Sequence, residues 1–271
     1  MVGRRIGVWF DRLMLALVLA VLVVPVLWVG LSAFKPRTEV AALPPHLFVR
    51  PTLENFVELF GRTDFGQNTL NSLIVATGST LLGLGLAAPA SFAMAWHRLS
   101  WPATATLFAR MAPGALFLLP WFLMFSDVGL TGTHLVLILT HAVITLPVGV
   151  WVLLPYFEAM PRDLVESAQV DGASSMQALL KVALPVAMPG LVVAAILCFV
   201  FSWNYFLFAL VLSGFNTKTA IVASFNFVGE GVTNWGALMA AAVVIALPPL
   251  LLTLLIQRRL VAGLASGAVK G

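Results

Sequence analysis

The sequence predicts an all-α fold, a polytopic membrane protein with six transmembrane helices. Two observations support this prediction. Hydrophobic residues make up 61% of the 271-residue chain and charged residues only 10%, an excess that a single soluble core could not bury. Apolar stretches with almost no charge also recur along the chain, each at least about 20 residues long and so able to cross a bilayer as a helix. We therefore expect one transmembrane domain over residues 1–271, embedded in a lipid membrane.

The expected spans begin and end near polar or charged segments. The first follows Arg12, and the last is closed by Arg258. The third contains Arg110, whose side chain can extend to the headgroups about two turns into the helix. Prolines inside the spans, such as Pro113, are interpreted as kinks whose backbone groups are satisfied by neighbouring helices. In chain order the spans cover residues 13–34, 69–96, 104–126, 133–157, 190–213 and 236–257.

The basic residues predict which side of the membrane each loop occupies. Six spans place both termini on the same side as residues 158–189, and that side holds ten of the 15 Lys and Arg residues. The positive-inside rule assigns this side to the cytosol. The outer loop 35–68 is then the longest external segment, with a short helix expected at 53–60. The modest net charge of +4 fits this orientation and does not indicate a nucleic-acid partner.

Buried ionisable groups are scarce in the predicted spans. His141 is the one candidate near the middle of a span, and we interpret it as a hydrogen-bonded packing residue. An ion-coupled secondary carrier, the alternative from a different class, would need buried acids. A membrane enzyme or a metal site would need clustered His, Asp or Glu residues, and the four histidines are scattered. Cys198 is the single cysteine, so it cannot form an internal disulfide and is expected to be a packed thiol.

Residues 158–189 form a polar insert that is predicted to fold as two short helices. Pro161 favours a helix start, and the acid that follows in the first turn complements the helix dipole. Gly172 is expected to end this first helix in the left-handed conformation. Ser174 and Gln177 have the spacing of a capping box and predict the start of the second helix.

Small residues distinguish the insert from an ordinary solvated hairpin. Met160, Leu164 and Ala168 are expected to share one helix face. Ser167, Ala168 and Gly172 together would let the helix fit closely into a groove of another protein. From the spacing alone, a helical hairpin exposed to solvent remains the alternative.

The insert also contains a pattern that is typical of one protein family. The pattern is Glu-Ala-Ala, three residues, Gly, nine residues and Ile-x-Leu-Pro, here with a serine and a valine as conservative replacements. The matching residues are Glu166, Ser167, Ala168, Gly172, Val182, Leu184 and Pro185. In this pattern, and in its flanks and C-terminal tail, the chain resembles permease subunits of ATP-driven, binding-protein-dependent importers, the sugar-type branch with the maltose and trehalose permeases. The resemblance covers nearly the whole chain.

The resemblance implies a set of partners and contacts. The insert would dock into a cleft of a cytosolic ATPase subunit through Glu166, Ser167, Ala168, Asp171, Gly172, Leu184 and Pro185, and the tail would add a contact through Gly267, Lys270 and Gly271. The complex would contain a second, non-identical permease subunit, two ATPase subunits and an extracytoplasmic solute-binding protein. The chain itself is expected to hold no catalytic residue and no cofactor, with ATP and Mg bound by the ATPase subunits. The location implied is the bacterial or archaeal cytoplasmic membrane.

The expected solute is a sugar, and a polyol, a glycerol-phosphate-like compound or a modified sugar is the alternative. Sugar sites combine aromatic faces with hydrogen-bonding side chains. The residues that fit this description are Asn71, Trp121, Phe122, Trp203, Asn204 and Tyr205. Packing inside the protein, or anchoring at the membrane interface, is the alternative role for each of them.

Overall fold

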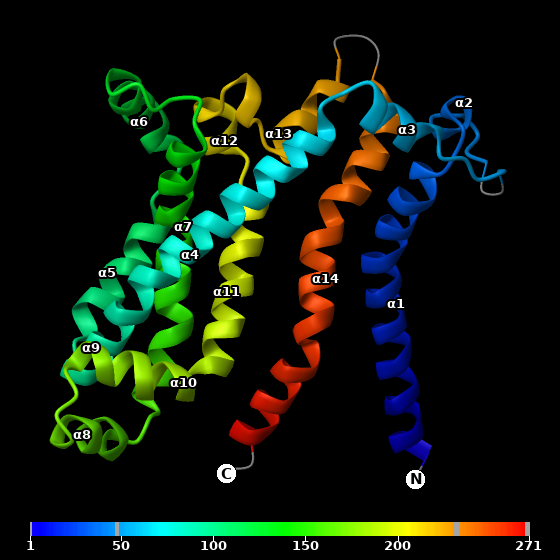
Figure 1. Cartoon of the computed structure of the whole chain (residues 1–271). Coiled ribbons are helices and arrows are strands. Elements are labelled where there is room, and N and C mark those ends of the chain that lie inside the picture. Colours follow the sequence, from blue (N-terminus) through cyan, green and yellow to red (C-terminus); the bar gives the residue numbers. More distant parts are fainter. Residues whose placement is uncertain (1, 47–48, 230–232, 269–271) are drawn as a thin grey trace. The chain divides into compact units, whose positions relative to one another are not determined.

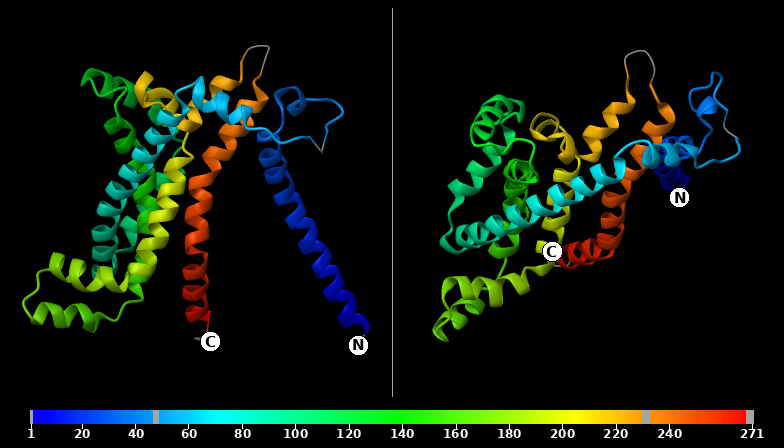
Figure 2. Two further views of the ribbon diagram at one scale, coloured as in Figure 1. Left: turned by 45° about the vertical axis from the view of Figure 1, so that its right-hand side comes forward. Right: turned by 45° about the horizontal axis from the view of Figure 1, so that its top comes forward.

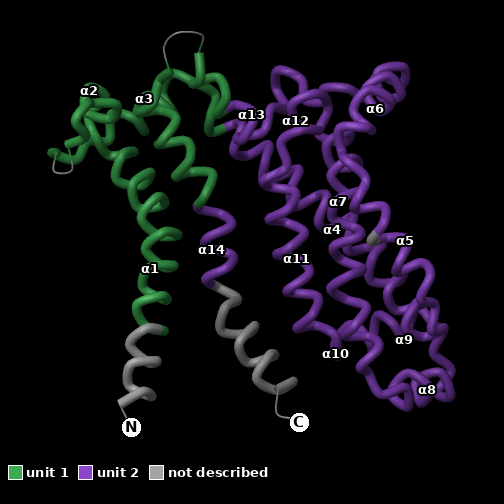
Figure 3. Tube along the Cα trace, turned by 180° about the vertical axis from the view of Figure 1, so that it is seen from behind, with its two compact units in different colours: residues 1–66, 224–246 green, residues 67–223, 247–271 purple. Residues whose placement is uncertain are grey.

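A computed structural model describes residues 2–46, 49–229 and 233–268, with side chains for 11–46, 49–106, 108–229 and 233–254. Within these ranges every regular element is a helix, apart from one isolated antiparallel bridge between Val228 and Thr233. The all-α prediction is therefore confirmed for the described residues. The chain divides into two compact units, residues 1–66 with 224–246 and residues 67–223 with 247–271 (Figure 3).

Five long helices carry most of the apolar sequence (Figure 1). They are α1 (Val2–Ala33), α4 (Phe65–His97), α7 (His134–Glu158), α11 (Met188–Trp203) and α14 (Trp235–Ala268). The shorter α-helices are α2 (Arg37–Val40), α3 (Glu54–Gly61), α5 (Ser100–Met111), α6 (Ala115–Asp127), α8 (Arg162–Val170), α9 (Ser175–Ala178), α10 (Leu184–Val186), α12 (Leu207–Leu212) and α13 (Ala220–Ser224). A π-helical turn, η1 (Leu179–Ala183), and two 3₁₀ turns, η2 (Phe215–Thr217) and η3 (Phe225–Phe227), complete the set.

Several helices are long and apolar enough to cross a membrane. In the searched part of the chain four qualify alone: α1 from Asp11 onward, α4, α7, and α14 as far as Leu254. They match the first, second, fourth and sixth predicted spans. Two bent pairs, α5 with α6 and residues 175–186 with α11, bring the number to six if each pair counts as one span.

The prediction of one continuous helix over 104–126 is wrong. Helix α5 ends at Met111, α6 begins at Ala115, and the two meet at 91°. The break lies at Ala112, whose backbone is extended (φ −64°, ψ 126°) directly before Pro113. A residue that precedes proline avoids the helical conformation, because the proline ring collides with its backbone. Pro113 therefore marks the end of a helix rather than a kink within one.

The prediction of a helix over 190–213 is also wrong at its C-terminal end. Helix α11 ends at Trp203, and α12 starts separately at Leu207. The Asn204 side chain donates a hydrogen bond from Nδ2 to the Val200 carbonyl at 2.9 Å, and this bond caps the end of α11. At the other end, α11 meets the preceding helical segment at 86° at Ala187, between Pro185 and Pro189.

The first unit is held together near the C-terminal end of α1. The fully buried Asn55 of α3 donates from Nδ2 to the carbonyls of Ala33 at 3.0 Å and Lys35 at 2.8 Å. The Phe34 and Phe56 rings pack with centroids 5.0 Å apart. Helix α3 confirms the short helix expected at 53–60. Along α1 the apolar side chains from Leu13 to Leu27 remain exposed, as expected for a surface that faces lipid or another subunit.

The core of the second unit lies where α7 packs against α4 and α11. Helices α7 and α11 run side by side (Figures 1 and 2). The buried cluster contains Leu84 from α4, Leu153 and Phe157 from α7, and Ala194 and Cys198 from α11. Cys198 is fully buried and its thiol is free, as predicted.

Polar side chains join the same three helices inside this core. The Ser202 hydroxyl lies 2.7 Å from Ser79 Oγ and 2.9 Å from His141 Nδ1. The Thr145 hydroxyl donates to the Ser79 carbonyl at 2.8 Å. Hydrogen bonds of this kind fix the register of helices that have no hydrophobic drive to associate within a bilayer. The interpretation of His141 as a hydrogen-bonded packing residue is confirmed.

Replacing Gly149 by alanine should separate α4 from α7. A Cβ atom at Gly149 would lie 2.8 Å from Ala87 Cβ and 3.1 Å from Leu84 Cδ2, so the helix backbones would have to move. We expect a loss of roughly 1–3 kcal/mol in the free energy of unfolding, as for other overpacked cores. Thermal unfolding in detergent measures it. Gly85→Ala is the matched control, because its Cβ would meet nothing within 4 Å. Equal stability of the two variants would contradict this packing.

Candidate functional site: the insert between α7 and α11

Helix α8 forms the first arm of the insert, and its start follows the local sequence signals. Pro161 occupies the N-cap position with an extended backbone, and Asp163 lies in the first turn, where a carboxylate complements the helix dipole. The helix runs from Arg162 to Val170, in the place that the sequence predicted.

Gly172 ends this arm in the left-handed conformation that was predicted, with φ +88°. The Ala173 amide donates to the Ala168 carbonyl at 2.9 Å, and the Gly172 amide donates to the Gln169 carbonyl at 3.0 Å. These two bonds form a Schellman motif, in which glycine is favoured because it has no Cβ to oppose the positive φ. The direction of the turn therefore depends on Gly172.

The second arm begins with the predicted capping box. The Gln177 amide donates to Ser174 Oγ at 3.3 Å, and the Ser174 amide donates to Gln177 Oε1 at 3.0 Å. From Ser175 the chain continues through α9, η1 and α10 to Val186. The two arms lie beneath the C-terminal end of α7 as a helical hairpin (Figures 1 and 2).

Buried apolar side chains attach the hairpin to the core of the second unit. Val165 is 2% exposed and is the one residue of α8 that is fully packed. Ala178, Leu179 and Ala183 from the second arm join the same cluster as Phe157 of α7. Of the three residues expected to share a face, Met160 is buried and Leu164 is 42% exposed, so the packed face of α8 is centred on Val165 instead. A displacement of the hairpin must therefore move the end of α7.

The opposite surface of the hairpin is open. It presents Glu166, Ser167, Asp171 and Gly172, all exposed. Apolar side chains are exposed beside them, with Val170 at 87% and Met176 at 55%. In the described part of the chain, neither Glu166 nor Asp171 forms an ion pair. Apolar groups flanked by unpaired acids suit a protein partner that supplies a hydrophobic cleft and basic side chains.

The remaining residues predicted for docking differ in their positions. Ala168 is partly buried, and Leu184 is partly buried against the core cluster. Pro185 is exposed. Gly267 falls in the last turn of α14, whereas Lys270 and Gly271 lie outside the described residues.

The structure gives Asn71 a structural role. It is fully buried, and its Nδ2 donates to the carbonyls of Asn216 at 2.9 Å and Lys218 at 3.0 Å. Its Oδ1 lies 2.9 Å from His134 Nε2 and 3.1 Å from Gln67 Nε2. All hydrogen-bonding positions of the amide are therefore in use, and in this arrangement it has none left for a solute.

Two of the aromatic candidates lie close together. Trp121 and Tyr205 both pack on Phe208, with ring centroids 5.0 and 4.6 Å away. Trp203 is 3% exposed and stacks on Phe199. Asn204 and Phe122 are exposed. Phe208 was not predicted from the sequence. Trp121 and Tyr205 are 84 positions apart, and the fold brings both of them onto the Phe208 ring.

Comparison with known proteins decides the family of the chain. A family model described as the inner membrane component of binding-protein-dependent transport systems matches residues 1–266. The chain belongs to this family. The family supplies the non-catalytic membrane component of such systems, so ATP hydrolysis belongs to a separate subunit. This inner membrane component is thus an integral membrane permease, as the resemblance implied.

Similar proteins are known from sequence and from structure. The chain is 37% identical to the trehalose transport system permease protein SugB of Mycobacterium tuberculosis, over 99% of both chains. It is 33% identical to the sulfoquinovosyl glycerol transport system permease protein SmoH of Agrobacterium fabrum, over 91% of this chain and 88% of that one. A chain of a bacterial alginate transporter, solved with a periplasmic protein that holds an alginate pentasaccharide, has the same fold: TM-score 0.69, 18% identity, 95% of this chain and 96% of that one.

Proposed function

We propose that this inner membrane component is one of two non-identical permease subunits in an ATP-driven sugar importer. It crosses the cytoplasmic membrane six times with both termini in the cytosol, and each bent helix pair acts as one span. The open surface of the α8 hairpin supports the proposal most strongly. Val170 and Met176 are exposed beside the unpaired Glu166. A partner that covers this surface would bury their apolar area, and that burial would stabilise the complex.

Two ATPase subunits are the proposed partners at the cytosolic face, and they hold ATP and Mg. Closure of the ATPase pair would move the hairpin that contacts it, and the packing of Val165 against the end of α7 would pass the movement to the spans. ATP and a loaded solute-binding protein would both favour the outward-facing state, so the transport cycle is a two-state equilibrium biased by its ligands. The carboxyl-terminal tail, including Gly267, Lys270 and Gly271, is proposed as a second ATPase contact.

A carbohydrate is the proposed solute. The relatives transport trehalose or sulfoquinovosyl glycerol, and the alginate transporter handles an acidic oligosaccharide. Trp121 and Tyr205 are the residues we propose to line the solute path, because the fold brings them together on Phe208. A polyol, a glycerol-phosphate-like compound or a modified sugar is the alternative solute. An extracytoplasmic binding protein would deliver it.

Cysteine labelling tests both the orientation and the partner. Helices α6 and α8 lie at opposite ends of α7 (Figure 1). Without the ATPase, Ser167→Cys on α8 should react with a membrane-impermeant maleimide only in inside-out vesicles, and in the assembled complex a bifunctional cross-linker should join it to the ATPase subunit. Ser126→Cys on α6 is the matched control and should react only in right-side-out vesicles, without that cross-link. Both serines are exposed, and the native Cys198 is buried and should not react. Labelling of both sites from the same side would refute the proposed orientation.

A further inference from the structure

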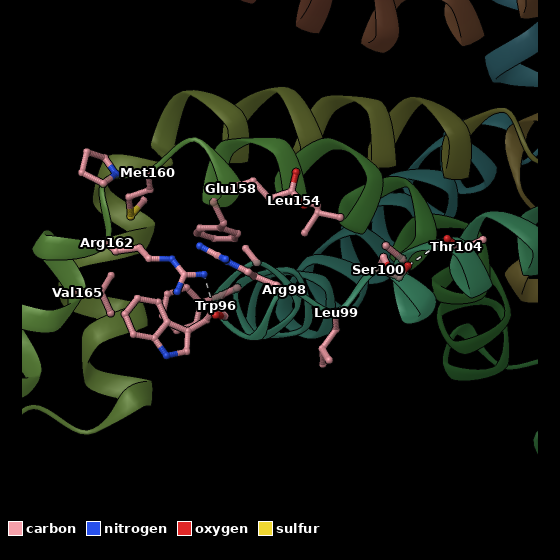
Figure 4. Close-up of a pocket in the computed structure, with 15 residues that line it drawn as sticks. Trp96, Arg98, Leu99, Ser100, Thr104, Leu154, Glu158, Met160, Arg162 and Val165 are labelled. Atoms are coloured by element: carbon pink, nitrogen blue, oxygen red, sulfur yellow. Dashed lines mark hydrogen bonds between the residues drawn. The ribbon is translucent and has the colours of Figure 1, made fainter.

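A cavity of about 500 Å³ lies beside the N-terminal end of α8, within the second unit. It lies between the C-terminal ends of α4 and α7 and the first turns of α5 and α8 (Figure 4). Its walls include the aromatic side chains of Phe92, Trp96 and Phe157. None of the residues proposed for docking lines this cavity, so the contact with the ATPase does not account for it.

Two arginines supply positive charge to the cavity. Arg98 follows α4 with the unusual φ of 54°, and Arg162 is the first residue of α8. In Figure 4 the Arg98 side chain, from the turn after α4, and the Arg162 side chain, from α8, both extend toward the middle of the pocket. Arg162 is held there by a hydrogen bond from Nη2 to the Trp96 carbonyl at 3.1 Å, with Cζ 5.4 Å from the Trp96 ring centroid.

Neither guanidinium is neutralised. Glu158 also lines the cavity, yet among the described residues neither Arg98 nor Arg162 forms an ion pair with it or with any other carboxylate. Two arginines and one glutamate leave a net charge of +1. Unneutralised guanidinium groups in one partly enclosed space favour an anion between them, and a phosphate accepts two parallel hydrogen bonds from each.

The start of α5 adds hydrogen-bond donors to the same cavity. Ser100, Ala103 and Thr104 line the wall, and the N-cap residue Leu99 provides no side-chain hydrogen bond. The first amides of a helix have no partner within the helix, and Ser100, in the cavity wall, carries one such amide. The helix and the two arginines therefore favour the same kind of ligand.

We propose that this cavity binds the headgroup phosphate of an anionic phospholipid from the cytosolic leaflet. The assignment depends on the proposed function for the orientation of the chain. The spanning helices α4 and α7 both end at the cavity, which puts it at headgroup depth. Helix α5, whose first turn lines the cavity, also carries exposed apolar side chains, with Trp101 at 73% and Phe108 at 67%, against which acyl chains would pack. A soluble phosphate would leave these apolar side chains uncovered.

A bound headgroup would stabilise the position of the α8 hairpin. Arg162 and Val165, both on α8, form part of the cavity wall. A phosphate shared by Arg98 and Arg162 would join the end of α4 to the start of α8 and remove the repulsion between the two charges. The lipid would thus stabilise the position of the surface that meets the ATPase.

Lipid exchange on the native chain tests the proposal without any mutation. The full chain, purified with the subunits it retains, is placed in nanodiscs of phosphatidylglycerol and phosphatidylcholine and released gently for native mass spectrometry. We expect one retained phosphatidylglycerol per chain, with a preference of roughly tenfold over phosphatidylcholine. Equal retention of the two lipids would overturn the proposal. Displacement of the lipid by inorganic phosphate would also overturn it, because the site would then be one for the free ion.

Variants locate the binding site. R98Q/R162Q should lower lipid retention about tenfold, whereas R98K/R162K, which keeps the charges but loses the paired donors, should lower it less. Lys181→Gln on the second arm is the control; it lies outside the cavity wall and should retain the lipid as the native chain does. Unchanged retention in R98Q/R162Q would refute the site. Lipid retention is measured without any transport assay, so it tests the lipid site separately from the proposed function. A chain that keeps the lipid but does not bind the ATPase would contradict the proposed function and leave the lipid site standing.

Discussion

Reversing the charge at Glu166 is expected to abolish solute uptake while the chain still inserts into the membrane. The side chain is exposed at the middle of α8 and lies outside the buried cluster that holds Val165, so Glu166→Lys should leave the fold intact. Its carboxylate has no ion pair among the described residues, which leaves it available to a basic group of the ATPase. Loss of a charge pair at an interface typically costs about 2–5 kcal/mol. Copurification of the ATPase should therefore fall by at least about 30-fold.

Two further variants separate the effect of the contact from the effect of the charge. Glu166→Gln removes the charge without reversing it and should retain part of the uptake. Lys181→Glu reverses another exposed charge on the hairpin, at a variable position of the docking pattern, and should keep most of the uptake. Membrane content and the unfolding temperature are measured for each. Native uptake and native ATPase copurification in Glu166→Lys would defeat the assignment of this surface.

Substitutions at Gly172 should reduce transport in the order that their backbone preferences predict. A Cβ at this position would meet nothing within 4 Å, so the constraint is the positive φ and not the available space. Asparagine tolerates this conformation, alanine costs roughly 1 kcal/mol, and valine, which is β-branched, costs more. We expect uptake near the native level for Gly172→Asn, an intermediate level for Gly172→Ala, and at least a tenfold loss for Gly172→Val. Uptake and ATPase copurification are compared across the series.

A different order would point to another role for the glycine. If Gly172→Asn and Gly172→Val were equally inactive, the side chain itself would be clashing with the partner, and the conformation of the turn would not be the limiting property. Gly85→Val in α4 serves as a control for the general cost of valine, because a Cβ there also meets nothing within 4 Å and the backbone φ is not positive.

The hairpin could be predicted from sequence because its signals are local. Pro161, Gly172 and the pair Ser174 and Gln177 each act within a few residues, and the structure shows a helix start, a left-handed turn and a capping box at these positions. The apolar helices α1, α4, α7 and α14 were predictable because their length and hydropathy are also local properties.

The misjudged elements are those where two local signals compete. Residues 104–126 are apolar enough for a span, yet Pro113 forces Ala112 out of the helical conformation. At Asn204, a side chain bond to the preceding turn accompanies the end of a helix that hydropathy alone would have continued. Apolar composition indicates a location in the membrane, and it does not determine where a helix bends.

Contacts between distant residues could not be predicted from one sequence. Asn71 was a reasonable candidate for binding a solute, and only the fold shows its amide holding the carbonyls of Asn216 and Lys218. The convergence of Arg98 and Arg162 on one cavity has the same origin, since they are 64 positions apart, one in the turn after α4 and the other at the start of α8. The pairing of such residues depends on the packing of α4, α7 and α8, which no local pattern specifies.

Reconstitution in liposomes tests the central claim most directly. The purified chain, alone or with its partner permease, the ATPase subunits and the binding protein, is assayed for uptake of labelled sugar with MgATP or with a proton or sodium gradient. We expect uptake only from the complete assembly with the loaded binding protein and MgATP, and none from a gradient. Sugar uptake by the chain alone, driven by a proton or sodium gradient, would contradict the account.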